Sequence, residues 1–236
     1  MKAGNKYRFL MLPVLLQVII LLTITLTACG GTTNKNIQMG KDDQPESAAA
    51  KSAPDVNTSA IDTITLGGGC FWCVEAIYER LAGVVSAVSG FSGGTVKNPT
   101  YEEVCTGSTG HAEVVQIAYD TTKISLDEIL KVFFSVHDPT TLNRQGNDVG
   151  TQYRSVIFYR DKHQKDVAAS IINALGRENV YNRPIVTQLE PFTKFYKAED
   201  YHQEYYDNNK NAPYCRLVIQ PKLEKFEKVF KDRLKK

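Results

Sequence analysis

The sequence predicts an α/β fold in which strands and helices follow one another along most of the chain. Short runs rich in β-branched residues alternate between apolar and polar side chains, as strands do. Between these runs, apolar residues recur at helical spacing, and glycines and a helix-capping motif mark the boundaries. The composition, 42% hydrophobic and 23% charged over 236 residues, is typical of a globular protein and excludes disorder of the whole chain.

The first half of this body predicts three strands and one helix. Residues 61–66 alternate and are rich in β-branched side chains, and the three glycines at 67–69 end the strand. The helix is indicated by apolar residues at helical spacing before a stop at Gly83: Val74, Ile77, Tyr78 and Leu81. Residues 84–91 and 113–119 are the next predicted strands, separated by a polar loop.

The second half begins with a capping box, Ser125-x-x-Glu128, which starts a second helix. The remaining predicted elements are a strand over 153–159, a helix over 162–175, a strand over 185–189 and a terminal helix with Leu223, Phe226, Val229 and Phe230. The order β-α-β-β-α-β matches a split βαβ, ferredoxin-like sandwich with C-terminal extensions. Two polar segments, 92–110 and 138–152, are too long for simple connections, and we expect them to carry function.

The first 29 residues have the order of a secretory signal. Lys2, Lys6 and Arg8 precede an apolar run over residues 9–26, and small residues lead into Cys29. This ending resembles the lipobox of bacterial lipoproteins, in which the cysteine is acylated and becomes the mature N-terminus. The alternative is an uncleaved anchor helix with an incidental cysteine. Both interpretations predict an extracytoplasmic domain held at a bacterial membrane, and the lipobox predicts that lipid on Cys29 is the anchor.

Residues 30–60 are polar and small, and they predict a flexible tether because they cannot bury enough apolar surface to offset their ordering entropy. The domain over residues 61–236 holds 22 of the 28 Lys+Arg and 22 of the 26 Asp+Glu. A formally neutral domain gives no electrostatic reason to expect nucleic acid as a partner. The four histidines do not form the Cys–His clusters of a structural zinc site, so no metal is expected.

Cys70 follows the three glycines and begins the first predicted helix. Unpaired N–H groups and the positive end of the helix dipole favour a thiolate there, and they can lower a cysteine pKa from about 8.5 to roughly 3.5–7.5. Cys73 lies one helical turn further on, within disulfide reach. Phe71 and Trp72 could form a pocket for a methyl or thioether group. The alternative is a buried pair of small cysteines among core aromatics, because a CxxC motif alone fits redox, metal and structural roles.

Six blocks, in order, resemble the peptide methionine sulfoxide reductase A family and span most of residues 61–236. With Cys73, the first block has the form GCFWC, and the lipobox at Cys29 adds a resemblance to a lipoprotein form of the family. It identifies residues 61–236 as the catalytic domain. The blocks are GCFW at 69–72, NPTYEEVC at 98–105, TGHAE at 109–113, HDP at 137–139, RQGNDVGTQYRS at 144–155 and AEDYHQ at 198–203.

The resemblance implies thiol-dependent reduction of methionine S-sulfoxide, free or in proteins. Cys70 would attack the sulfoxide sulfur and become a sulfenic acid as methionine leaves. Glu113 would be the acid that hydrogen-bonds or protonates the oxygen, which requires an apolar pocket to keep the carboxyl neutral. Tyr101 and Tyr153 would donate hydroxyl hydrogen bonds to the same oxygen. Considered without the family, a surface residue at the start of a strand is the favoured interpretation of Glu113, and either tyrosine could be a core or strand residue.

Three further residues carry over as substrate-binding residues. Phe71 and Trp72 would hold the methyl group, and Asp148 would position a neighbour or bind the substrate backbone, although it could also serve an ordinary turn. His111 and His202 lie within matching blocks and receive no catalytic role, because the chemistry needs no imidazole. No cofactor is expected.

Regeneration requires a second thiol to resolve the sulfenic acid. Cys215 lies in a polar, turn-rich C-terminal segment that could bring its thiol to Cys70 at modest loop-closure cost. We expect Cys215 to be the first resolving cysteine, with Cys73 as an alternative or as a relay to the external reductant. Cys105 is interpreted as structural, and Cys29 would be consumed by lipid.

The expected partners are oxidised proteins or peptides carrying methionine sulfoxide, a thioredoxin-like dithiol reductant and a membrane bound through the lipid; we expect a monomer. One alternative is a thioredoxin-like disulfide oxidoreductase that uses the CxxC pair, although the nearest later prolines, Pro99 and Pro139, lie in polar loops. Another is a non-enzymatic lipoprotein that binds exported proteins and holds Cys70 and Cys73 in a static disulfide.

Overall fold

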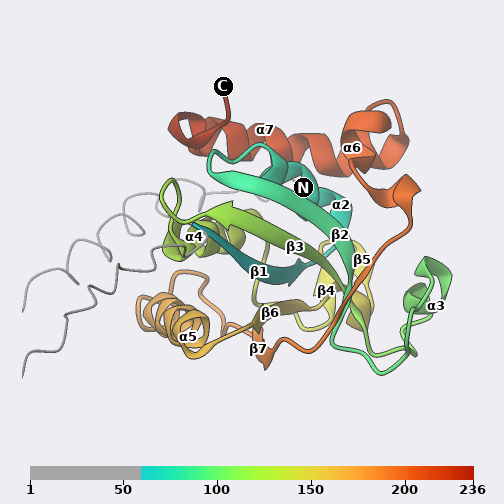
Figure 1. Ribbon diagram of the computed structural model, residues 1–236, viewed down its shortest axis with the longest axis horizontal. Coiled ribbons are helices and arrows are strands. Elements are labelled where there is room, and N and C mark those ends of the chain that lie inside the picture. The colour runs from blue at the N-terminus through green and yellow to red at the C-terminus, as the bar shows by residue number, and fades with distance from the viewer. Residues whose placement is uncertain (1–59) are drawn as a thin grey trace, which may run out of the picture. The chain divides into compact units, whose positions relative to one another are not determined.

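The computed structural model describes residues 60–236, which belong to a compact unit over residues 59–236 (Figure 1). The predicted signal peptide with its lipobox at Cys29 and almost all of the predicted tether over 30–60 lie outside the described residues. Among residues 60–236, no helix is both long and apolar enough to span a membrane.

A six-stranded sheet forms the centre of the domain, with the strand order β7-β6-β1-β3-β2-β8 (Figure 1). All neighbouring strands are antiparallel except β6 and β7, which run parallel. The strands are β1 (Ile61–Gly68), β2 (Val84–Ser92), β3 (Ala112–Asp120), β6 (Ser155–Tyr159), β7 (Gln188–Pro191) and β8 (Phe195–Lys197). The four strands β6-β1-β3-β2 have the order of a split βαβ unit, which confirms the predicted fold class with its C-terminal extensions.

The helices agree with the predicted periodicity over most of their lengths. Ser125 and Glu128 form the predicted capping box, and the Tyr78 hydroxyl donates to the Ile129 carbonyl at 2.9 Å, which joins α2 to α4. The helices are α2 (Phe71–Glu79), α3 (Tyr101–Cys105), α4 (Leu126–Val136), α5 (Lys162–Arg177), α6 (Tyr205–Asn208) and α7 (Gln220–Val229). Helix α7 contacts α2 and lies beside it (Figure 1).

The two long polar segments contain structure that the sequence interpretation missed. Segment 92–110 holds α3, which begins with a capping box between Thr100 and Glu103. Segment 138–152 holds a small hairpin of β4 (Arg144–Gln145) and β5 (Asp148–Val149). Tyr153, expected at the start of a strand, ends the 3₁₀ turn Thr151–Tyr153, because its N–H bonds back to the Gly150 carbonyl at 3.0 Å.

Two predictions for the C-terminal third need correction. The strand expected over 185–189 begins at Gln188, because the Val186 N–H is bonded to the Pro139 carbonyl outside the sheet. The polar segment before Cys215 contains the predicted turn at residues 210–211, but Cys215 itself lies outside it: Cys215–Ile219 form a wide helical turn of the π type that leads directly into α7. The Cys215 side chain is 0% exposed, so burial holds this segment in place.

The core lies between the sheet and its helices, and it places the turn from β1 to α2 against α4. Its largest fully buried side chains include Tyr78, Phe91, Phe133, Leu66 and Ile117. His137 follows α4 and contacts the Phe133 carbonyl and the Ser155 hydroxyl. Burial lowers the pKa of His137 to about 4, so this ring is a neutral link between α4 and β6.

Gly69 connects β1 to α2 with a φ of +93°, which favours glycine. A Cβ at this position would lie 2.6 Å from the side chain of Gln145, so an added methyl group meets both backbone strain and a packed neighbour. Gly69 therefore fixes the entry into the helix that begins with Cys70 and Phe71.

We predict that Gly69→Ala lowers the free energy of unfolding by about 1 to 3 kcal/mol, because alanine is strained at this φ and crowds Gln145. Gly176→Ala is the matched control: Gly176 lies in α5, and nothing occupies the 4 Å around its added Cβ. This control should instead gain about 0.5 to 1 kcal/mol. Urea unfolding of both variants checks the prediction, and an unchanged midpoint for Gly69→Ala would contradict it.

Candidate active site

Cys70 is the N-cap residue of α2, directly after the strand-to-helix turn, as predicted. Its carbonyl accepts the Cys73 N–H at 3.1 Å, and this first turn brings the two thiols into hydrogen-bond contact. Cys70 is only 6% exposed, and all four cysteines among residues 60–236 are free thiols. The described structure therefore has no static Cys70–Cys73 disulfide.

The predicted lowering of the Cys70 pKa is wrong for this state. Burial raises the pKa of Cys70 well above its usual value, and the neighbouring Cys73 and Glu113 raise it further. The pKa of Cys73 is lowered instead, first because the Cys70 thiol donates a hydrogen bond to it and then because the Lys222 ammonium lies nearby. Of the two thiols, Cys73 is therefore the one whose thiolate is favoured, whereas Cys70 holds its proton more strongly.

Glu113 lies near the start of β3 and is 1% exposed, which excludes the surface alternative. Its Oε2 accepts the Phe71 N–H, the first free donor of α2, at 3.0 Å. Burial is the main reason why the pKa of Glu113 rises to about 8, and the charges of Asp148 and Cys73 add to it. At neutral pH this carboxyl is therefore mostly protonated and can donate a proton at the base of the site.

Tyr101 and Tyr153 both lie within electrostatic range of Glu113, one from α3 and the other from the 3₁₀ turn Thr151–Tyr153. Both side chains are half-buried. Burial is the main cause that raises the pKa of each phenol, and the nearby Glu113 adds to it. Both hydroxyls therefore keep their protons and can donate hydrogen bonds near the acid.

Aromatic rings gather at the first turn of α2. Phe71 is fully buried, and its ring lies 6.0 Å from that of Trp72 and 6.1 Å from that of Tyr101, centroid to centroid. Trp72 stacks on Tyr205 at 3.7 Å, and its Nε1–H donates to Nδ1 of His202 at 3.2 Å. Sequence reasoning gave His202 no role, and the structure shows that it supports Trp72.

Asp148 is held by a residue that sequence reasoning missed. The Tyr214 hydroxyl donates to Asp148 Oδ2 at 2.8 Å, which ties the segment before α7 to the β4–β5 hairpin. Tyr214 also contacts the Cys70 and Cys73 thiols, and its hydroxyl lowers the pKa of both. Its position directly before Cys215 was the only available signal in the sequence.

The other two cysteines of the described domain differ in exposure. Cys215 is buried, and burial together with the charge of Cys73 raises the pKa of its thiol. Cys105 is the last residue of α3 and is an exposed thiol beside Tyr101. It is therefore not part of the core, and its predicted structural role stays a prediction. Residues 60–236 contain no group of three or more His, Cys, Asp or Glu side chains that could hold a metal ion.

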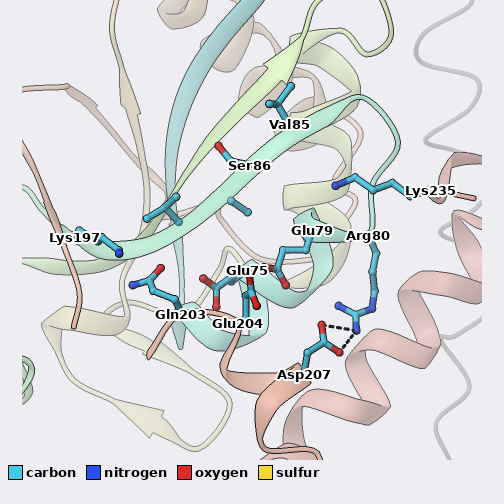
Figure 2. A pocket seen from close by; sticks show the side chains of 12 residues that line it. Glu75, Glu79, Arg80, Val85, Ser86, Lys197, Gln203, Glu204, Asp207 and Lys235 are labelled. Carbon is cyan, nitrogen blue, oxygen red and sulfur yellow. Dashed lines mark hydrogen bonds and ion pairs between the residues drawn. The ribbon is translucent and has the colours of Figure 1, made fainter. Parts of the chain in front are cut away.

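A separate hollow of about 700 Å³ lies beside α2 and is lined mainly by charged side chains (Figure 2). Glu75, Glu79 and Glu204 line it, and Arg80 forms an ion pair with Asp207 at 2.8 Å. None of the predicted site residues lines this hollow.

The buried carboxyl of this hollow has a neighbour of its own. Glu75 is 1% exposed, and burial is the main cause that raises its pKa to about 8. Glu75 Oε1 and the Ser89 hydroxyl have no partner of standard hydrogen-bond geometry, yet Ser89 is close enough to lower the pKa of Glu75. A protonated Glu75 can donate a hydrogen bond to the Ser89 hydroxyl. Ser89 lies on β2, so this strand supplies the partner of the buried carboxyl, and no ligand is needed.

The comparisons with known proteins agree with this site. The family model for peptide methionine sulfoxide reductase matches residues 62–234. The peptide methionine sulfoxide reductase MsrA of Saccharolobus solfataricus is 58% identical over 175 residues, which cover 74% of this chain and 98% of the relative. The MsrA of Trichodesmium erythraeum is 52% identical over 174 residues, covering 74% and 98%.

Two solved structures share the fold. Methionine sulfoxide reductase A of Corynebacterium diphtheriae has a TM-score of 0.59 at 36% identity, covering 66% of this chain and 78% of that one. Reduced Mxr1 from Saccharomyces cerevisiae has a TM-score of 0.60 at 37% identity, covering 66% and 89%. With the family model, the two relatives and a buried Cys70–Glu113 site in agreement, the chain belongs to the peptide methionine sulfoxide reductase family, in its MsrA branch.

Proposed function

We propose that this protein reduces the S-epimer of methionine sulfoxide, free or in proteins, to methionine. One observation carries the proposal: a protonated, buried Glu113 accepts the Phe71 N–H, so the acid is fixed beside Cys70 at the first turn of α2. A sulfoxide reductase needs a sulfur nucleophile and a proton for the departing oxygen in one place. Family membership supports the same reaction.

The reaction balances with the groups of this site. The Cys70 sulfur attacks the sulfoxide sulfur and forms a sulfur–sulfur bond with it. The oxygen then passes from the substrate sulfur to the Cys70 sulfur and the sulfur–sulfur bond breaks, so methionine leaves and Cys70 becomes a sulfenic acid. Cys70 is oxidised by two electrons and the sulfoxide is reduced by two. Glu113 supplies a proton to the oxygen, and the proton released from the Cys70 thiol balances it. Tyr101 and Tyr153 donate hydrogen bonds to the oxygen as charge develops on it.

The substrate methyl group would lie against Phe71 and Trp72, because sulfur and its methyl group pack favourably on aromatic rings. Trp72 is held from behind by Tyr205 and His202. Asp148, bonded to Tyr214, would bind the substrate backbone or keep Tyr214 over the thiols. These contacts give the pocket a fixed wall on the helix side.

A thioredoxin-like disulfide oxidoreductase remains the alternative function for the CxxC pair. Family membership does not favour it, because the family model that matches residues 62–234 is that of a sulfoxide reductase. Residues 60–236 also contain no cis peptide bond, whereas a thioredoxin-type site usually places a cis-proline opposite the motif.

The proposal includes the location of the enzyme. Cys29 would carry the lipid, residues 30–60 would act as the tether, and the domain would repair oxidised proteins outside the cytoplasmic membrane. Cytosolic thioredoxin cannot reach such a site, so the reductant would be an extracytoplasmic thioredoxin-like dithiol or a membrane electron carrier. The order of basic, apolar and small residues before Cys29 supports this location.

Cys70→Ser should abolish reduction of the S-epimer of methionine sulfoxide, because a serine hydroxyl cannot form the sulfenic acid. Methionine production from a dabsylated substrate with dithiothreitol measures it. Wild-type protein should leave the R-epimer unchanged. Insulin-disulfide reduction, assayed in parallel, tests the oxidoreductase alternative. Full turnover by Cys70→Ser, or insulin reduction without sulfoxide reduction, would overturn the proposed function.

The proposed acid predicts a loss of activity on the alkaline side. Glu113 is protonated below its pKa of about 8, so the rate of the sulfoxide step should fall about tenfold per pH unit above that value. Glu113→Gln should lower this rate by about 100-fold or more and remove the alkaline limb. Single-turnover rates between pH 6 and 10 check both effects.

Glu75→Gln is the matched control for this experiment, because Glu75 is equally buried and its pKa also rises to about 8, but it lies outside the site. This control should keep the wild-type rate and the wild-type alkaline limb. An unchanged profile for Glu113→Gln would contradict the role of Glu113 as the acid.

The lipid anchor makes a separate prediction. In a bacterial host, the wild-type chain should partition with membranes and incorporate labelled palmitate, whereas Cys29→Ser should incorporate none and should leave a larger, unprocessed chain. Sulfoxide reduction by the two chains in detergent should be equal. Palmitate labelling of Cys29→Ser at the wild-type level would refute lipidation at this cysteine.

A further inference from the structure

Lys222 contacts a reacting group of this site, although no motif pointed to it. Its Nζ lies 3.8 Å from the Cys73 sulfur and donates a hydrogen bond to it, which joins α7 to α2. Among residues 60–236, no carboxylate lies within ion-pair distance of Lys222. A half-buried ammonium without a carboxylate partner is therefore directed at a sulfur.

The fold holds this ammonium in place. Leu223 and Phe226 are buried side chains of α7, and Ile219 is buried in the turn that precedes it. These three buried side chains pack the first turns of α7 against the rest of the domain, and α7 contacts α2. Lys222 therefore reaches Cys73 from a fixed backbone position and not from a mobile tail.

Other charged and titratable groups face Cys73 from the elements around it. The Cys70 thiol at the N-cap of α2 and the nearby Tyr214 hydroxyl both favour the thiolate of Cys73, whereas the carboxylate of Asp148 on β5 opposes it. Glu113 on β3 interacts with Cys73, but it is mostly neutral below pH 8. Lys222 is the cation among these groups.

The fourth thiol of the domain also lies within electrostatic range. Burial raises the pKa of the Cys215 thiol, and the interaction with Cys73 raises it further. The hydrogen bond from the Cys70 thiol goes to Cys73. The thiolate, which is the reactive form of a cysteine, is therefore less favoured at Cys215 than at Cys73.

We propose that Lys222 acts in the regeneration step: its ammonium holds Cys73 as a thiolate, and Cys73 is thereby the first thiol to attack the Cys70 sulfenic acid. This inference rests on the proposed function, since it needs the sulfenic acid as its substrate. It selects Cys73 over Cys215 as the first resolving cysteine and gives Lys222 a positioning role that acts through Cys73.

The step balances with the groups already present. The Cys73 sulfur attacks the Cys70 sulfur, a sulfur–sulfur bond forms and the sulfur–oxygen bond of the sulfenic acid breaks. The oxygen takes a proton from Glu113 and leaves as water, and solvent then reprotonates Glu113. Cys73 is oxidised by one electron and the Cys70 sulfur is reduced by one. An external dithiol is needed only afterwards, to reduce the disulfide.

The test is a single turnover of full-length protein with methionine sulfoxide and without reductant, quenched by acid at successive times. Methionine yield reports the Cys70 step, and peptide mass spectrometry identifies the disulfide that appears first. Lys222→Met removes the charge and keeps the length, and Lys222→Arg keeps a cation. Lys225→Met is the matched control, because Lys225 is an exposed lysine of the same helix.

Wild-type protein should yield one methionine per chain and form the Cys70–Cys73 disulfide first. Lys222→Met should give the same methionine yield but form this disulfide about tenfold more slowly at pH 7, the effect of about one unit in the Cys73 pKa. The difference should vanish above about pH 9.5, where the thiol ionises without help. Lys222→Arg and Lys225→Met should follow wild-type kinetics.

A Cys70–Cys215 disulfide as the first wild-type product would overturn the proposal, and so would a Lys222→Met profile that matches wild type at every pH. A slow step in Lys222→Met that stays slow at high pH would indicate a packing defect and would also refute the charge effect. Absence of methionine from the wild-type single turnover would instead refute the proposed function. Failure of the Lys222 proposal and failure of the proposed function therefore give different results.

Discussion

The hydrogen bond from the Phe71 N–H to Glu113 is the interaction on which the rest of the site depends. It joins the first turn of α2 to β3 at 3.0 Å, and it places a buried carboxyl beside the residue that caps the helix. The bond requires the chain to leave β1 and enter α2 without a side chain at Gly69, where a Cβ would meet Gln145. A backbone constraint in the β1–α2 turn thus determines where the acid and the nucleophile meet.

Cys70, Glu113 and the two phenols favour their protonated forms, because the effect of burial on their pKa values is larger than the effect of the helix N-terminus. Burial raises the pKa of Cys70, Glu113 and the phenols of Tyr101 and Tyr153, so the groups around the proposed oxygen position are donors at neutral pH. The helix dipole alone would favour a thiolate at Cys70, but an adjacent thiol and carboxyl oppose it. A reductase needs both proton donors and a charged sulfur, and in this structure the lowered pKa belongs to Cys73.

Local patterns predicted the central sheet, the main helices and the residues of the CxxC turn, because each signal lies within a few residues of the element it describes. The Ser125 capping box shows this, and the Thr100–Glu103 box of α3 could have been read in the same way. Tyr214 and Lys222 could not be found so, since they meet α2 from more than 140 positions along the chain through the packing of α7. The prediction of a lowered Cys70 pKa was wrong for the same reason. The pKa is raised mainly by burial and by neighbours that are distant in the sequence or lie across the helix turn, which the local pattern does not show.

The first turn of α2 also bears on whether a Cys70–Cys73 disulfide would disturb the substrate pocket. Residues three apart on a helix share one face, whereas the two residues between them point elsewhere. Trp72 follows this rule, because its indole is held away by stacking on Tyr205 at 3.7 Å and by its bond to His202. Closing the disulfide would therefore draw two neighbouring sulfurs together along one face while the pocket wall stays anchored on another. In this geometry, resolution by Cys73 needs no long movement of the C-terminal segment, whose buried Cys215 and Ile219 resist one.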